Sequence, residues 1–136
     1  MSELIQQLKR HEGFKSKPYK CTAGKLTIGY GLNLDAGIDE ELAEIILKYK
    51  ISKVTAKLEG ADWFNSIDSQ ARRDLIVNMA FNIGVSGIFK FVKMINAISV
   101  RDYHLAANEM LDSKWAKQVG SRATELAEQM RSGQYK

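Results

Sequence analysis

The chain has 136 residues, 45% of them hydrophobic, and a net charge of +4 at pH 7. This length fits a single domain over residues 1–136 and is sufficient to bury a hydrophobic core without disulfide bonds. The single cysteine excludes an internal disulfide, and the N-terminus lacks the basic start and apolar run of a secretory signal. No stretch approaches the roughly 18 apolar residues of a membrane span. We therefore expect a chain made in the cytoplasm without stable membrane insertion.

The positive charge suggests a polyanionic partner. The candidates are nucleic acid, anionic lipid and the bacterial cell wall. Lysines and arginines are, however, spread along the chain with acidic residues between them, as in "DEELAEIILKYKISK". That distribution is also typical of an ordinary solvated surface. A nucleic-acid-binding protein would show a basic helix or a stripe of basic and aromatic residues. The sequence has neither, so we expect no nucleic-acid partner.

The N-terminal part predicts a helix followed by a β hairpin. Ser2 can cap a helix that runs to about Glu12, and Gly13 ends it. Glu12 lies on the same face of this helix as Leu4, Ile5 and Leu8. Residues 17–34 predict a short β element, because Pro18 excludes a helix interior, "TAGK" is typical of a turn and "KLTIGYG" alternates.

A second helix is predicted after Gly37, capped by Asp39 and continuing with some break to about Leu58. Its apolar stripe consists of Leu42, Ile45, Ile46 and Tyr49. The segment "EGADWFNSIDS" is then a break between this part of the chain and a helical remainder. Asp68 can cap the next helix, which Gly84 ends. Its apolar face consists of Leu75, Ile76, Met79, Ala80 and Ile83.

Three further helices and one short helical piece are predicted toward the C-terminus. One runs from about Ile88 to Ile98 with Ile88, Phe91, Val92 and Ile95 on its apolar face. Ser99 and Asp102 can form a capping box for a helix to about Leu111, and a short piece around Trp115 follows. Gly120 and Ser121 open a last helix with Ala123, Leu126, Ala127 and Met130 inward. The pattern indicates an α+β fold, a small lobe with a β hairpin joined to a helical lobe.

Metal chemistry is excluded by the spacing of the possible ligands. His11, His104 and Cys21 are far apart and form no paired ligand pattern. We expect no metal and no cofactor. A cysteine protease is disfavoured, because Cys21 lies in a turn region and not at a helix N-terminus that would activate its thiol.

Glu12 is the first candidate for catalysis. It continues the apolar stripe of the first helix and lies in its last turn, where burial and the helix dipole would both favour the protonated carboxyl. A glycosidase needs such a group to protonate the leaving oxygen. Alternatively, Glu12 is an ordinary solvated glutamate at a helix end.

The spacing around Glu12 favours the catalytic alternative. Eight residues separate Glu12 from Cys21, and five separate Cys21 from Thr27. This stretch resembles the E-x8-(D/C)-x5-T active-site pattern of phage-type lysozymes (endolysins, glycoside hydrolase family 24), with "TIGYG" following. The segments "NMAFNIG", "SGIFKF", "AANEMLDSKW" and "VGSRATE" follow in the order of that family. The resemblance covers residues 4–128.

The resemblance implies a lysozyme-like α+β fold with a cleft between two lobes. The N-terminal catalytic lobe would span about 13–60, and the helical lobe about 61–136 together with the first helix, 2–12. The cleft would bind peptidoglycan glycan strands and cut the β-1,4 bond between N-acetylmuramic acid and N-acetylglucosamine. Endolysins are made in the host cytoplasm and reach the periplasmic wall after a holin opens the membrane. A monomer would suffice.

The resemblance also implies residue roles. Glu12 would be the general acid, Thr27 would help to hold the attacking water, and Cys21 stands where many relatives carry aspartate. The substrate-binding residues would be Gly31, Asn33, Phe81 and Arg122, of which the last pairs with the catalytic glutamate in the family. Phe81 is alternatively a plain core residue.

The sequence does not fix the catalytic role of Cys21. Only about 3% of a thiol with the ordinary pKa of about 8.5 is ionised at pH 7. Cys21 could act as a partly ionised base, with Lys20 or Lys25 lowering its pKa, or as a polar group that orients water, or as a nucleophile. The competing class is a lysozyme-like module that binds peptidoglycan and has lost catalysis.

Overall fold

The computed structural model describes residues 2–136. The chain divides into two compact units, with the boundary between Ile46 and Leu47. The long helix α2 (Glu40–Leu58) crosses this boundary and so belongs partly to each unit. It is one continuous helix, so the predicted break within it is wrong.

The first unit combines one helix with a small antiparallel sheet. Helix α1 (Ser2–Glu12) precedes strands β1 (Lys15–Lys20), β2 (Leu26–Gly29) and β3 (Leu32–Asn33), which lie in the order β1-β2-β3. A single turn of 3-10 helix, η1 (Leu34–Ala36), follows β3. The predicted first helix and the predicted β element are both present.

Thr27 sits in the middle strand with a pairing partner on each side. Its Cα is opposite that of Tyr19 on β1 and that of Asn33 on β3. Its side chain is buried, whereas Leu26 on the other face is exposed. The carboxylate of Asp35 accepts a hydrogen bond from the Leu26 backbone N–H at 2.9 Å, which ties η1 to β2.

Helix α1 does not bury the stripe that the sequence suggested. None of its residues is buried, and about half of the surface of each of Leu4, Ile5 and Leu8 is exposed. The strands of the unit have at most six residues, so its sheet offers little surface against which a helix could pack. Ile45, Ile46 and Tyr49 of α2 are exposed as well.

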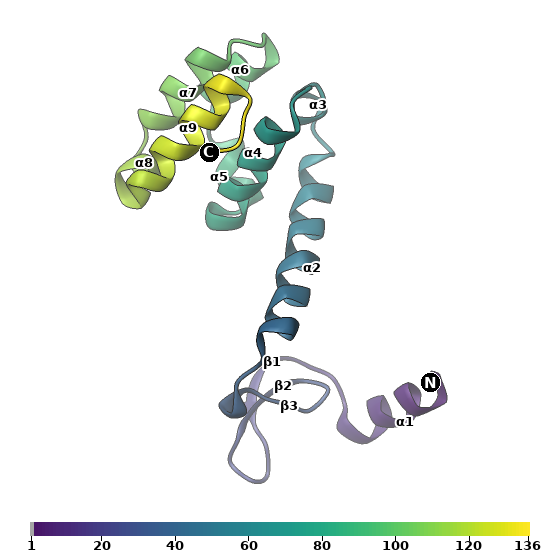
Figure 1. The fold of residues 1–136 in the computed structure, drawn as a ribbon. Coiled ribbons are helices and arrows are strands. Elements are labelled where there is room, and N and C mark those ends of the chain that lie inside the picture. The colour runs from purple at the N-terminus through teal and green to yellow at the C-terminus, as the bar shows by residue number, and fades with distance from the viewer. Residues whose placement is uncertain (1) are drawn as a thin grey trace. The chain divides into compact units, whose positions relative to one another are not determined.

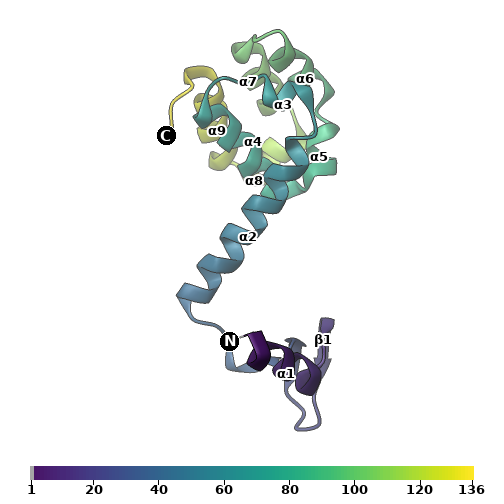
Figure 2. The ribbon, with the colours of Figure 1, turned by 90° about the vertical axis from the view of Figure 1, so that its right-hand side faces the viewer.

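The second unit is helical and contains the hydrophobic core (Figure 1). Its helices after α2 are α3 (Asp62–Asn65), α4 (Gln70–Ile83), α5 (Val85–Phe89), α6 (Val92–Ser99), α7 (Tyr103–Leu111), α8 (Lys114–Val119) and α9 (Ser121–Ser132). A view turned by 90° shows these helices gathered together at the C-terminal end of α2 (Figure 2). The predicted inward residues of α4 and α9 are buried in the core, except Ile83, which is partly buried.

Four predictions for these helices need correction. The break after α2 contains a short helix, α3, whose Phe64 is buried. Ser69, and not Asp68, caps α4, because the Ser69 hydroxyl accepts a hydrogen bond from the Arg72 N–H. The Asp68 carboxylate instead lies 3.8 Å from the Arg101 guanidinium.

The helix predicted from about Ile88 to Ile98 is in fact two helices. The backbone of Phe91 leaves the helical region at ψ 60°, which separates α5 from α6, and Val92 is exposed. The predicted capping box is also wrong. Asp102 caps α7 alone by accepting from the Leu105 N–H, while the Ser99 hydroxyl donates to the Ile95 carbonyl within α6.

Arg72 connects the start of α4 with the end of α9. Its guanidinium donates to the carbonyl oxygens of Met130 at 2.6 Å and Arg131 at 2.8 Å, both in the last turn of α9. The same group lies 3.9 Å from the ring centroid of Tyr103. A cation at these carbonyls satisfies acceptors that a helix end leaves unpaired and complements the helix dipole.

The fold class predicted from sequence is confirmed. The described chain is mostly helical with one three-stranded antiparallel sheet, which is an α+β arrangement consistent with a lysozyme-like fold. Among residues 2–136, none of the helices combines the length and the hydrophobicity that a membrane crossing requires.

Candidate active site

Glu12 ends α1 with its carboxylate directly against the backbone of Gly31. A Cβ atom placed on Gly31 would lie 2.6 Å from Glu12 Oε2, which is closer than such atoms approach, and 3.0 Å from its carboxyl carbon. Gly31 also has φ +82°, a conformation that side chains disfavour. The missing side chain at residue 31 therefore provides the space that the Glu12 carboxylate occupies.

The exposure of Glu12 differs from the expectation that it points toward a core. Its side chain is exposed in the structure. A bulky substrate can reach an exposed carboxyl at a helix end. The glycine beside this carboxyl has no side chain that would block the approach. This arrangement fits contact with a ligand better than a role in packing.

Cys21 lies in the tight turn between β1 and β2. Its backbone N–H donates to the Lys25 carbonyl at 2.9 Å, and its own carbonyl accepts from the Gly24 N–H at 2.8 Å. The pKa of the Cys21 thiol is lowered, first by a hydrogen bond from the Lys25 backbone N–H and then by one from Ala23. The turn, and not the lysine ammonium groups considered from sequence, therefore favours the thiolate.

Thr27 contributes a hydroxyl next to this thiol. Its Oγ1 donates to the Lys25 carbonyl at 2.9 Å, and hydrogen bonding from the same hydroxyl is a smaller cause of the lowered Cys21 pKa. One hydroxyl proton cannot serve both acceptors at once. In this structure the hydroxyl proton is directed to the Lys25 carbonyl, so the hydroxyl oxygen remains able to accept a hydrogen bond.

Asn33 lies opposite Thr27 in the pairing of β2 with β3, and its side chain is already used to cap η1. Its Oδ1 accepts hydrogen bonds from the backbone N–H groups of Asp35 and Ala36 and so caps η1. Only its amide NH2 is left to contact a ligand. Asp35 was not singled out from the sequence, yet its backbone N–H donates to Asn33 and its carboxylate accepts from the Leu26 N–H. The bond from a residue two positions on to an asparagine side chain is the usual geometry of an Asx turn.

Phe81 and Arg122 lie together in the second unit. Both line a cavity of about 320 Å³, which Val77 and Asn78 line as well. The Arg122 guanidinium donates through Nε at 3.1 Å and through Nη2 at 2.7 Å to Asn78 Oδ1, which fixes its plane. Phe81 is 43% exposed, so the plain core alternative does not describe it.

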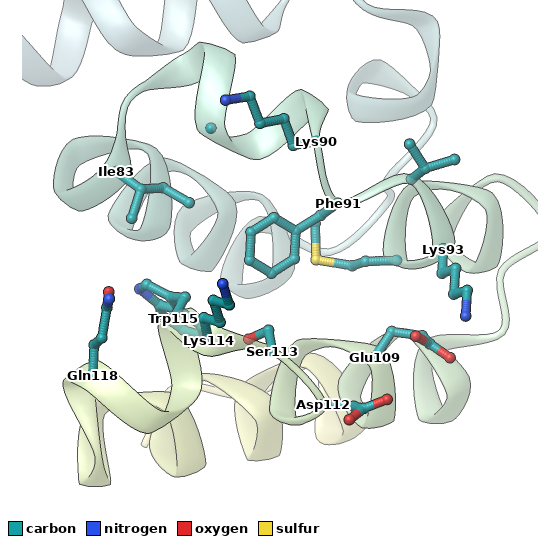
Figure 3. Close-up of a pocket in the computed structure, with 13 residues that line it drawn as sticks. Ile83, Lys90, Phe91, Lys93, Glu109, Asp112, Ser113, Lys114, Trp115 and Gln118 are labelled. Carbon is teal, nitrogen blue, oxygen red and sulfur yellow. The ribbon is translucent and has the colours of Figure 1, made fainter.

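A second cavity of about 830 Å³ in the same unit contains none of the predicted site residues (Figure 3). Phe91 and Trp115 meet edge to face inside it, with ring centroids 6.3 Å apart, and the Trp115 indole donates to Asn82 Oδ1. Charged side chains surround these rings, namely Lys90, Lys93, Glu109, Asp112 and Lys114. The cavity suits binding more than proton transfer. Residues of the sequence segments "SGIFKF" and "DSKW" line it.

The predicted site residues thus form two groups. Glu12, Cys21, Thr27, Gly31 and Asn33 belong to the first unit, whereas Phe81 and Arg122 belong to the second. Within the described residues, no group of three or more histidine, cysteine, aspartate or glutamate side chains is placed to hold a metal ion. An accessible carboxyl, a thiol and a hydroxyl in one small unit are groups that a hydrolase uses for acid–base catalysis.

Comparison with known proteins identifies the class. The model of the phage lysozyme family matches residues 9–132. An endolysin of Acyrthosiphon pisum secondary endosymbiont phage 1 is 36% identical over 124 residues, which are 88% of this chain and 82% of that protein. The chain belongs to the phage lysozyme family.

Two more distant relatives extend the comparison. "Probable T4-type lysozyme 2" of Dictyostelium discoideum is 27% identical and aligns with 100% of this chain and 98% of its own length. The pre-baseplate central spike protein Gp5 of Enterobacteria phage T4 is 25% identical over 90% of this chain, but only 26% of that protein is covered.

Proposed function

We propose that this chain is an endolysin that hydrolyses the β-1,4 bond between N-acetylmuramic acid and N-acetylglucosamine in bacterial peptidoglycan. The observation that carries the proposal is the match to the phage lysozyme family over residues 9–132, which includes Glu12, Cys21 and Thr27. The relative named endolysin, which covers most of both chains, supports the same function.

Glu12 is the general acid in this proposal. Breaking a glycosidic bond requires a proton on the leaving oxygen while positive charge develops on the sugar ring. The exposed Glu12 carboxyl can receive a glycan strand, and the bare backbone of Gly31 leaves room beside it. Arg122, held by Asn78, would contact the glycan strand together with Phe81 and Asn33.

Cys21 takes the place of the aspartate that many relatives carry. Its lowered pKa means that more thiolate is present near neutral pH than in an ordinary cysteine. A thiolate can accept a proton from water, and the adjacent Thr27 hydroxyl can hold that water. This role predicts inversion at the anomeric carbon, whereas a sulfur nucleophile predicts retention. NMR of the anomer first released from a defined oligosaccharide separates the two.

Access to the wall follows from the same proposal. An endolysin is made in the host cytoplasm and acts on the periplasmic wall after a holin has opened the inner membrane. The described residues include no membrane-spanning helix. One chain of this size carries every proposed catalytic group, so the active form is a monomer.

The direct test is clearing of a suspension of chloroform-treated Gram-negative cells. The purified chain should reduce the turbidity, and Glu12→Gln, which keeps the shape of the side chain but removes its acid, should not. Tight binding to isolated walls without clearing would instead indicate the competing class, a peptidoglycan-binding module without catalysis.

A further inference from the structure

An aromatic pair lies exposed in the first unit. Phe14 follows α1 and Tyr30 follows β2, and their ring centroids are 5.5 Å apart with a tilt of 48°. Phe14 is 62% exposed and Tyr30 is 47% exposed. The ammonium group of Lys9 lies 5.5 Å from the centroid of the Tyr30 ring. The three side chains form one surface, here called the aromatic platform.

The aromatic platform is adjacent to Glu12. Lys9 and Glu12 are three residues apart on α1 and therefore share a face of that helix. Lys9 contacts Tyr30, while the Glu12 carboxylate contacts the next residue, Gly31. Tyr30 directly precedes Gly31, so its Cα lies about 3.8 Å from the Cα of the residue that the Glu12 carboxylate contacts. Phe14 is only two residues after Glu12 in the chain.

The exposure of the Phe14 and Tyr30 rings to solvent suggests that they bind a ligand. Burial of a large apolar side chain is favourable, so an exposed aromatic pair gains free energy when a ligand covers it. The flat, carbon-rich face of a sugar ring is complementary to an aromatic face, through dispersion and weak C–H contacts. The Lys9 ammonium adds positive charge at the edge, which suits a polymer that carries carboxylates.

We propose that Phe14 and Tyr30 form a stacking subsite for a sugar ring of the glycan strand, next to the bond cleaved at Glu12. This inference rests on the proposed function, because it concerns the same substrate. Two rings and one lysine offer far less surface than the roughly 800 Å² per partner of a standard protein interface. A single saccharide ring is the occupant that matches this area and chemistry.

The experiment measures binding of a tetrasaccharide of alternating N-acetylglucosamine and N-acetylmuramic acid by calorimetry. All variants are built on Glu12→Gln, so that the ligand stays intact. Phe14→Ala and Tyr30→Ala should each weaken binding about tenfold, since aromatic contacts of this kind contribute on the order of 1 kcal/mol or more. Tyr30→Phe keeps the ring and should bind nearly as well as its parent.

Tyr49→Ala is the matched control. Tyr49 is 62% exposed and also carries a lysine over its ring, Lys53 at 5.3 Å, but it lies on α2 without an aromatic partner in the described residues. Unchanged affinity in the Phe14 and Tyr30 variants, or equal loss in Tyr49→Ala, overturns the inference. A large drop of the melting temperature in Phe14→Leu as well as Phe14→Ala also overturns it, since the ring would then serve packing. Clearing by the wild-type chain tests the proposed function separately.

Discussion

Replacing Gly31 by alanine tests whether the space at this residue places the catalytic carboxyl. The new Cβ would lie 2.6 Å from Glu12 Oε2, so one of the two groups must move. Glu12 is exposed and its side chain is flexible, so the carboxylate moves more easily than the backbone. The carboxyl should therefore be displaced by a large part of an ångström while the fold persists.

The two costs of this substitution can be estimated separately. Alanine at φ +82° costs roughly 1–2 kcal/mol of stability, because its Cβ crowds the backbone in the left-handed region. For a domain of this size that is a loss of about 4–8 °C in melting temperature. A catalytic group misplaced by about 1 Å can cost on the order of a hundredfold in rate. We expect Gly31→Ala to show both effects.

Gly29→Ala separates them. Gly29 has a similar φ of +68°, but a Cβ on it would meet nothing within 4 Å. It should lose similar stability in thermal denaturation and keep most of its activity on chloroform-treated cells. Equal losses of activity in the two variants, after correction for the folded fraction, would refute the argument that Gly31 makes room for Glu12.

Three further predictions concern the thiol, the cap of α9 and the core. Alkylation of Cys21 by iodoacetamide should reach half its maximal rate at a lower pH in the folded chain than in the chain unfolded in urea, because the turn lowers the thiol pKa; the same or a higher midpoint when folded would contradict this. Arg72→Met should lower the free energy of unfolding by about 1–3 kcal/mol in urea titrations, and Arg72→Lys should restore little of it, since lysine cannot bind both carbonyl oxygens and stack on Tyr103. Met79→Ala removes a fully buried side chain and should cost about 2–5 kcal/mol in the same titration, whereas a loss below 1 kcal/mol would mean that the core closes around the gap.

The helices of the second unit could be predicted because their apolar faces meet one core. The inward stripes of α4 and α9 follow the helical period, and nearly all of their members are buried. The boundaries were harder. Asp68 and Ser69 are adjacent and both are good capping residues, so the sequence cannot choose between them. Likewise, the apolar spacing continues through Phe91, where the structure separates α5 from α6.

The candidate site shows what spacing can and cannot predict. The interval from Glu12 to Cys21 and Thr27 indicated the family, because the pattern depends only on sequence order. The contact between Glu12 and Gly31 joins a helix end to a turn 19 positions later, which no local pattern encodes. The cause of the lowered Cys21 pKa was also missed, since backbone N–H groups are present at every residue and only the fold aims them.

The most direct test of the account identifies the chemical ends made in purified peptidoglycan. The wall is digested, the fragments are reduced with borohydride, and the new termini are identified by mass spectrometry. Cleavage as proposed gives reduced N-acetylmuramic acid ends with the wild-type chain and none above background with Glu12→Gln. Reduced N-acetylglucosamine ends, anhydro sugars, new peptide amines, or undiminished cleavage by Glu12→Gln would contradict it.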